Sequence, residues 1–132
     1  MTIRDLLRRT LVTASLAPAV RTNGTATGTA VDLRGYDSAI LTVQFGTWTD
    51  GTHTPSVQHS VDGTTYTAAA ASDLDGSFAA VNSAAGNGTV QSVGYIGAQR
   101  YVRVVMTTSG ATSGALSAAY VISGSPRNAP TV

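Results

Sequence analysis

Short runs in which apolar and polar residues alternate constrain the fold of this chain more than any other feature. In the run AILTVQFG the apolar residues Leu41, Val43 and Phe45 fall at every second position. Similar alternation recurs in TAVDL, SVQHSV, TVQSVGYI, YVRVVMTT and ALSAAYVIS. A period of two places such residues on one face of a half-buried β-strand. We therefore expect an all-β protein.

Turn-forming segments separate these runs and indicate the fold class. The segments TNGTATG, TDGTHTP, SAAGNG and TSGATSG are rich in Gly, Ser, Thr and Asn, which favour tight turns. Several short strands with regular turns predict one antiparallel β-sandwich of jelly-roll type, over residues 21–132. A length of 132 residues fits a single domain. The predicted core residues are Leu41, Val43, Phe45, Val57, Val102, Val104, Leu116 and Tyr120.

The segment 1–20 has a different pattern. Its apolar residues Ile3, Leu6, Leu7 and Leu11 fall on one face at helical spacing. We expect either a short amphipathic helix or an extended arm here. A helix of this length is marginal in isolation, so it needs a surface to pack on, either the sandwich or a neighbouring subunit.

Composition excludes several classes of function. Charged residues make up 11% of the chain and the net charge is +1, with no Lys and no Glu. This balance produces no long-range field that attracts nucleic acid, so we expect no direct nucleic-acid partner. The absence of Cys excludes disulfides and thiolate chemistry. No run approaches the roughly 20 apolar residues of a membrane-spanning helix, and we expect no membrane partner.

The pair Asp62-Gly63 lies between two strand-like runs and is typical of a β-hairpin. Glycine tolerates a positive φ, and an aspartate side chain bonds to nearby backbone N–H groups. A calcium loop is the alternative interpretation, also for Asp73 and Asp75 in DLDG. Such a loop needs a closing bidentate carboxylate, normally Glu, and the chain has none. We therefore expect a turn without an ion.

Other candidates for chemistry are few. His53, His59 and Asp50 lack a recognised metal-ligand spacing. His59 alternates with Val57 and Val61, which predicts a core or edge histidine with one hydrogen bond, whereas His53 lies in a segment that we expect to be a loop. The chain has neither a G-x-S-x-G elbow nor a P-loop lysine. We therefore expect no enzyme, no cofactor and no metal.

The runs VDLRGYDSAILTVQFG, HSVDGTTYT, YIGAQRYVRVVMTTSG and YVISGSPRNAP resemble small structural proteins of tailed bacteriophages. The resemblance covers residues 28–130. It implies a non-enzymatic β-sandwich that binds the outer surface of the head, as capsid decoration (cement) proteins do. The implied partners are the major capsid protein and further copies of this chain in a symmetric array. The implied location is the virion, after assembly in the host cytoplasm.

No motif of these phage proteins fixes their binding residues, so the interface is predicted from residue type. The candidates are Ile3, Leu6, Leu7 and Leu11 as apolar contacts and Arg8, Arg9, Arg100 and Arg103 as anchors. Arginine binds carboxylates on an acidic surface in two-point geometry. For Arg100 and Arg103 a solvated strand face is the alternative.

Two other functions stay open at this point. One is a different virion part, such as a tail or head–tail joining protein. The other is a secreted carbohydrate-binding sandwich, which needs an exposed aromatic side chain. Trp48 is the candidate for that role, and a partly buried loop anchor is the alternative interpretation of this residue.

Overall fold

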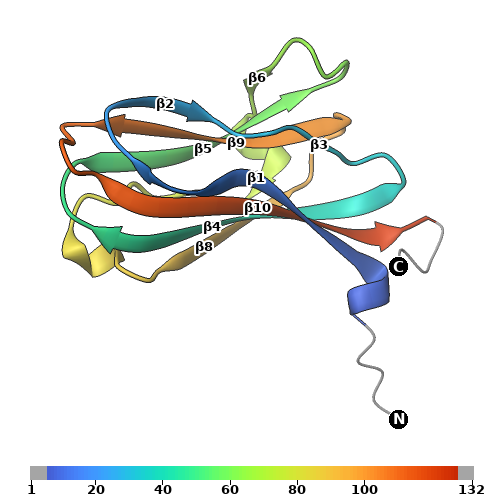
Figure 1. Ribbon diagram of the computed structural model, residues 1–132. Helices are drawn as coiled ribbons and strands as arrows, with labels where there is room; N and C mark the ends of the chain where they lie inside the picture. Colours follow the sequence, from blue (N-terminus) through green and yellow to red (C-terminus); the bar gives the residue numbers. More distant parts are fainter. Residues whose placement is uncertain (1–5, 128–132) are drawn as a thin grey trace.

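The computed structural model describes residues 6–127, which form two antiparallel β-sheets packed face to face (Figure 1). The predicted antiparallel β-sandwich is confirmed. Helical structure in this part of the chain is limited to three 3-10 turns, η1 (Leu7–Arg9), η2 (Ala71–Asp73) and η3 (Ala84–Gly86). No helix among the described residues is long and apolar enough to cross a membrane.

The first sheet has the strand order β1-β10-β4-β8-β7. Its strands are β1 (Thr10–Arg21), β10 (Ala115–Pro126), β4 (Tyr36–Trp48), β8 (Val90–Tyr95) and β7 (Leu74–Asp75). The second sheet has the order β2-β9-β5-β6, and β3 also pairs with β9. Its strands are β2 (Gly24–Thr27), β9 (Tyr101–Ser109), β5 (Thr52–Ser60), β6 (Thr67–Ala68) and β3 (Val31–Asp32).

The hydrophobic core lies between the two sheets. Alternate residues of β4 and β9 point into it, as the period of two predicts. Six of the eight residues predicted to face the core are buried: Leu41, Val43, Phe45, Val57, Val102 and Val104. The core also takes in Leu16 of β1 and Val121 of β10, so the first and last described strands both contribute to it.

The prediction that Leu116 and Tyr120 of β10 face the core is wrong. Leu116 is 41% exposed, and Tyr120 lies half-buried on the outer face of the sheet. Its two neighbours Ala119 and Val121 are the fully buried residues. Alternation separates two faces of a strand but does not say which one is buried. In the structure, the register of β10 with β4 places Ala119 beside Val43 and Val121 beside Leu41, and all four residues belong to the core.

The structure also corrects the expectation for residues 1–20. Thr10–Arg21 form strand β1, which pairs with β10, so the expected domain boundary falls inside a strand. The expected helix is reduced to the turn Leu7–Arg9, and Ile3 lies outside the described residues. Threonine and valine in this segment lose side-chain freedom in a helix and suit a pleated strand. Pairing with β1 also covers an edge of β10 that would otherwise be open.

Ser15 of β1 connects the two sheets. Its Oγ donates a hydrogen bond to the backbone oxygen of Thr29 (2.9 Å) and accepts one from the backbone N–H of Val104 in β9 (3.0 Å). The backbone N–H of Thr29 donates in turn to the Ser15 carbonyl (2.6 Å). A side chain at Gly28 would overlap the Ser15 hydroxyl. This connection therefore needs both the hydroxyl and the glycine.

Replacement of Ser15 with alanine is expected to lower the free energy of unfolding by about 1–3 kcal/mol, because the buried N–H of Val104 loses its acceptor. Ser117→Ala is the matched control, since Ser117 is buried to a similar degree and its hydroxyl has no partner among the described residues. Urea unfolding of both variants measures the difference. Equal losses in the two variants would contradict this role for Ser15.

Candidate functional site

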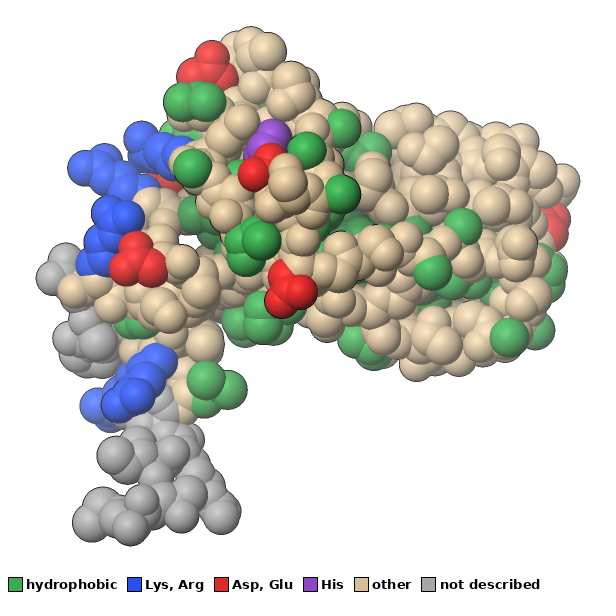
Figure 2. All heavy atoms as spheres, turned by 180° about the vertical axis from the view of Figure 1, so that it is seen from behind, with side chains coloured by type: hydrophobic (Ala, Val, Ile, Leu, Met, Phe, Trp, Pro, Cys, Tyr) green, Lys and Arg blue, Asp and Glu red, His purple; other side chains and the backbone are tan. Residues whose placement is uncertain are grey.

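Charged side chains gather at one end of the sandwich, the end where β4 and β9 begin, which we call the charged end. Figure 2 shows arginine and aspartate side chains concentrated there, while the other end carries almost no charge. The described charged residues at this end are Arg8, Arg9, Arg34, Arg100, Arg103, Arg127, Asp32, Asp37, Asp62, Asp73 and Asp75. Arg21 and Asp50 lie toward the opposite end.

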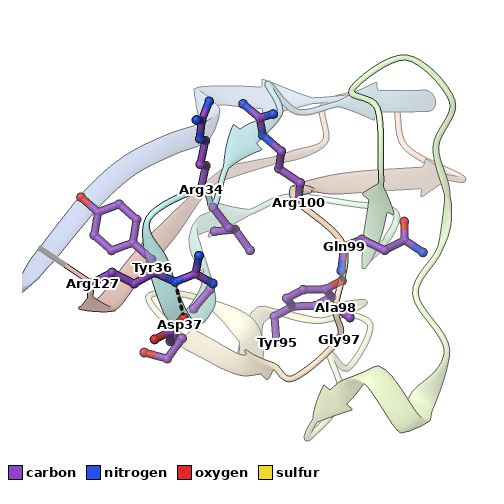
Figure 3. A pocket seen from close by; sticks show the side chains of 12 residues that line it. Arg34, Tyr36, Asp37, Tyr95, Gly97, Ala98, Gln99, Arg100 and Arg127 are labelled. Carbon is purple, nitrogen blue, oxygen red and sulfur yellow. Dashed lines mark hydrogen bonds and ion pairs between the residues drawn. The ribbon is translucent and has the colours of Figure 1, made fainter.

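A groove of about 480 Å³ opens at the charged end (Figure 3). Three segments line it: residues 33–39 at the start of β4, residues 95–100 between β8 and β9, and Arg127 after β10. These segments are far apart in the sequence and meet because β4 begins beside the end of β10 and beside the end of β8.

A tight turn forms one wall of the groove and presents Arg34. The backbone N–H of Tyr36 donates to the Leu33 carbonyl (3.0 Å), and Gly35 supplies the positive φ of 91° that this turn needs. Asp32 Oδ1 accepts the backbone N–H of Arg34 (2.9 Å). The segment DLRGYD therefore places the Arg34 side chain at the exposed tip of a braced turn.

Two ion pairs brace the walls of the groove. Arg100 donates from Nε to Asp32 Oδ1 (2.9 Å) and from Nη2 to Asp32 Oδ2 (2.7 Å), and Arg127 Nε donates to Asp37 Oδ1 (2.9 Å). The hydrogen bonds from Arg100 hold the pKa of the Asp32 carboxyl below its ordinary value, and the same contact raises the pKa of Arg100. Both partners of this pair are therefore ionised at neutral pH.

The outer face of the first sheet has the opposite character. Outward-facing residues of β1, β10, β4 and β8 form cross-strand rows, such as Val12, Ile122 and Ile40. We call this surface the uncharged face and define it by Val12, Val20, Ile40, Thr42, Gln44, Val90, Ser92, Leu116, Tyr120 and Ile122. Val12 is 60% exposed and Ile40 is 44% exposed. None of these ten residues is charged. The row of Ile40 continues through Gly94 to Asp75 on the edge strand β7, which lies outside the face so defined.

The outer face of the second sheet carries a row of threonines where the uncharged face has an apolar row. Thr25, Thr107 and Thr54 form one cross-strand row, and they are exposed on β2, β9 and β5. Short polar side chains of this kind are well solvated, so this face has little to gain from burial. The two outer faces of the sandwich are thus chemically distinct.

The predicted apolar contacts lie near the start of β1. Leu6 is 68% exposed and Leu7 is 73% exposed beside the turn η1, and Leu11 is 40% exposed in β1. Arg8 and Arg9 are exposed in the same turn.

The predicted anchors Arg100 and Arg103 both have partners within the chain. Arg100 lies on the rim of the groove and is paired with Asp32. Arg103 donates from Nε and Nη2 to Gln58 Oε1 (2.9 and 2.7 Å), and its guanidinium lies 3.7 Å from the centre of the Tyr66 ring. Arg100 therefore lies at the groove, whereas Arg103 lies on strand β9 of the second sheet.

Asp62-Gly63 forms the predicted hairpin turn between β5 and β6. Gly63 has a φ of 77°, so the reason given for glycine is confirmed. Asp62 Oδ1 accepts hydrogen bonds from the backbone N–H groups of Thr64 and Thr65 (2.9 Å each) and from the Ser60 hydroxyl (2.9 Å). These donors, the two backbone groups first, lower the pKa of the Asp62 carboxyl to about 2. One Asp62 oxygen is thus occupied in holding the loop.

Both histidines point into the sandwich. His59 is buried and its Nδ1 lies 2.9 Å from the Tyr95 hydroxyl, as expected for a core histidine. His53 lies in β5 and not in a loop; its ring contacts Thr108 Oγ1 (3.0 Å) and the Asp50 carbonyl (2.9 Å). Within residues 6–127, no group of three or more His and Asp side chains is placed to hold a metal ion.

Trp48 is half-buried at the end of β4 and packs against the core. Its indole N–H donates to the Gly51 carbonyl (2.9 Å). The interpretation of Trp48 as a partly buried anchor is therefore confirmed, and its polar atom is used within the protein.

Sequence reasoning did not find the groove or the uncharged face. The signal for Arg34 was present, because DLRGYD combines a turn glycine with an aspartate two residues before the arginine. No signal within one segment links this turn to residues 95–100 or to Arg127. No known protein family, curated protein or solved structure matches this chain.

The low pKa of Asp62 leads to a prediction about pH. Replacement of Ser60 with alanine removes one donor to Asp62 Oδ1, so the Asp62 pKa is expected to rise from about 2. Because the folded-state pKa is depressed, the stabilisation is present above the unfolded pKa of about 4 and disappears as the pH falls through the folded pKa. An acid titration followed by the carboxyl ¹³C shift of Asp62 measures its pKa in the unmodified protein and in the Ser60→Ala variant.

Ser56→Ala is the control for this titration, because the Ser56 hydroxyl bonds to the Val105 carbonyl and not to Asp62. An Asp62 midpoint near pH 4 in the unmodified protein, or an unchanged midpoint after Ser60→Ala, would contradict the proposed hydrogen bonding.

Proposed function

We propose that this protein is a non-enzymatic component of a phage virion, a capsid decoration (cement) protein that binds the outer surface of the head and stabilises it. The observation that carries the proposal is the uncharged face. The partner is suggested by the sequence resemblance to structural proteins of tailed phages. On this proposal the protein contacts the major capsid protein and further copies of itself.

The composition of the uncharged face favours contact with another protein. Burial of a charged group costs free energy unless the group is paired, and this face has none to bury. Burial of apolar side chains such as Val12, Ile40 and Leu116 contributes about 25 cal/mol per Å² of apolar surface. An uncharged face of this kind suits lateral packing, and many symmetric copies would make individually weak contacts add up.

The strand order supports the jelly-roll assignment as part of the same proposal. Consecutive strands occupy matching positions in the two sheets: β1 opposite β2, β4 opposite β5 and β10 opposite β9. If β2 and β3 are counted as one interrupted strand and the short β7 is left aside, this is the wrapping that we expect of a jelly roll. Viral capsid domains and lectins both use such folds.

The two alternatives have different support. A tail or head–tail joining protein would use the same uncharged face, with a different partner in the particle. A carbohydrate-binding sandwich would need an exposed aromatic platform. Trp48, the candidate for that platform, is half-buried and its indole N–H is bonded to Gly51. The decoration role is therefore the conclusion that we carry forward.

Ile40→Asp tests the docking face. Ile40 lies on the interior strand β4, in the row of the uncharged face with Val12 and Ile122, and a carboxylate there would have to be desolvated on contact. We expect the variant to fold and to lose most of its co-sedimentation with phage heads that were prepared without this protein. Thr54→Asp is the matched control, because Thr54 is an exposed mid-strand residue on the outer face of the second sheet.

The decoration role also predicts that heads without the protein release DNA at a lower temperature than coated heads. Equal co-sedimentation of Ile40→Asp and the unmodified protein would exclude the uncharged face as the docking surface. Heads that show no binding of the unmodified protein would refute the proposed function itself.

A further inference from the structure

We propose that the groove at the charged end binds a carboxylate group of a partner polypeptide, with Arg34 as the principal ligand. If the protein coats a phage head, the partner is an acidic segment of the capsid protein. That identification rests on the proposed function, whereas the chemistry of the groove rests on the residues that line it.

Among the described residues, one of the arginines that line the groove forms no ion pair. Three arginines line the groove, and two of them are paired: Arg100 with Asp32 and Arg127 with Asp37. Within residues 6–127, no ion pair joins Arg34 to an aspartate. Its guanidinium has five N–H donors in a planar fork, which matches the two oxygens of a carboxylate.

Arg34 and Arg100 can act on the same ligand. The two side chains come from neighbouring segments joined by the hydrogen bond from Leu33 N–H to the Arg100 carbonyl, and in Figure 3 they point in the same direction. Both guanidinium groups lower the pKa of Asp32, the hydrogen bonds of Arg100 more strongly and the charge of Arg34 to a smaller extent. Arg100 uses Nε and Nη2 for Asp32, so its Nη1 remains available to a ligand oxygen.

The wall that carries Arg34 is held in place before any ligand arrives. The backbone N–H of Leu33 donates to the Arg100 carbonyl (2.8 Å), and that of Arg127 donates to the Gly35 carbonyl (2.8 Å). On the opposite wall, the backbone N–H of Gln99 donates to the Tyr95 hydroxyl (3.1 Å). A ligand therefore pays little ordering entropy in the groove walls, which favours binding.

The charge balance favours a single carboxylate over a polyphosphate backbone. Asp32 and Asp37 lie beside the three arginines, so the excess is one positive charge. A nucleic acid would bring successive phosphates against these two aspartates. A polypeptide side chain brings one negative charge on an apolar stem, and Leu33, Ala39 and Ala98 line the groove for such a stem.

The test is an NMR titration of ¹⁵N-labelled protein with the peptide N-acetyl-Ala-Glu-Ala-amide, observed at the arginine Nε–H signals. We expect the signals of Arg34 and Arg100 to shift, and the peptide with Gln in place of Glu to leave them unchanged. Arg34→Gln should weaken binding of the Glu peptide about tenfold, as loss of a charge-assisted hydrogen-bonded pair does. Arg21→Gln is the control, an arginine that lies outside the groove and toward the opposite end of the sandwich.

Several outcomes would overturn the inference. These are equal shifts with the Glu and Gln peptides, unchanged affinity in Arg34→Gln, or tighter binding of a short single-stranded DNA or of inorganic phosphate than of the Glu peptide. The titration contains no phage particle. If phage heads bind the protein but the Glu peptide does not, the inference about the groove is refuted and the proposed function is not. If the Glu peptide binds but phage heads do not, the proposed function is refuted and the inference about the groove is not.

Discussion

The hydrogen bonds of Ser15 hold the two sheets together at the edge where the chain passes from one to the other. They fix β1, a strand of the first sheet, to Val104 in the second sheet and to Thr29 between β2 and β3. With β1 in place, β10 becomes an interior strand, and the row of Val12, Ile122 and Ile40 is complete. The uncharged face therefore depends on a polar contact that lies inside the protein.

The same topology separates the charges from the apolar surface. Strand pairing brings the start of β4, the end of β10 and the end of β8 to one end of the sandwich, and most of the described arginines and aspartates lie at or near that end. Ion pairs such as Arg100 with Asp32 use these charges locally. The protein thus has one broad face without charged side chains and one end where arginine and aspartate side chains gather.

Alternation predicted the strands because a half-buried strand has a period of two, and Leu41, Val43 and Phe45 are buried as expected. It did not orient β10, since Leu116 and the smaller Ala119 satisfy the same pattern on opposite faces. Helical spacing misled in the segment 1–20, where β-branched residues and the open edge of β10 favour a strand. The Asp62 turn was predictable because its interactions are local. The groove was not, because Arg34, Arg100 and Arg127 meet only through strand pairing.

Hydroxyl-radical footprinting of the protein, free and bound to phage heads, tests whether the uncharged face is the docking surface, because it reports the exposure of individual side chains. We expect oxidation of Val12, Leu116, Tyr120 and Ile122 to fall on binding, while oxidation of exposed residues on the outer face of β9 and β5 does not change. Protection confined to the second sheet, or no protection on the uncharged face of fully coated heads, would contradict this expectation.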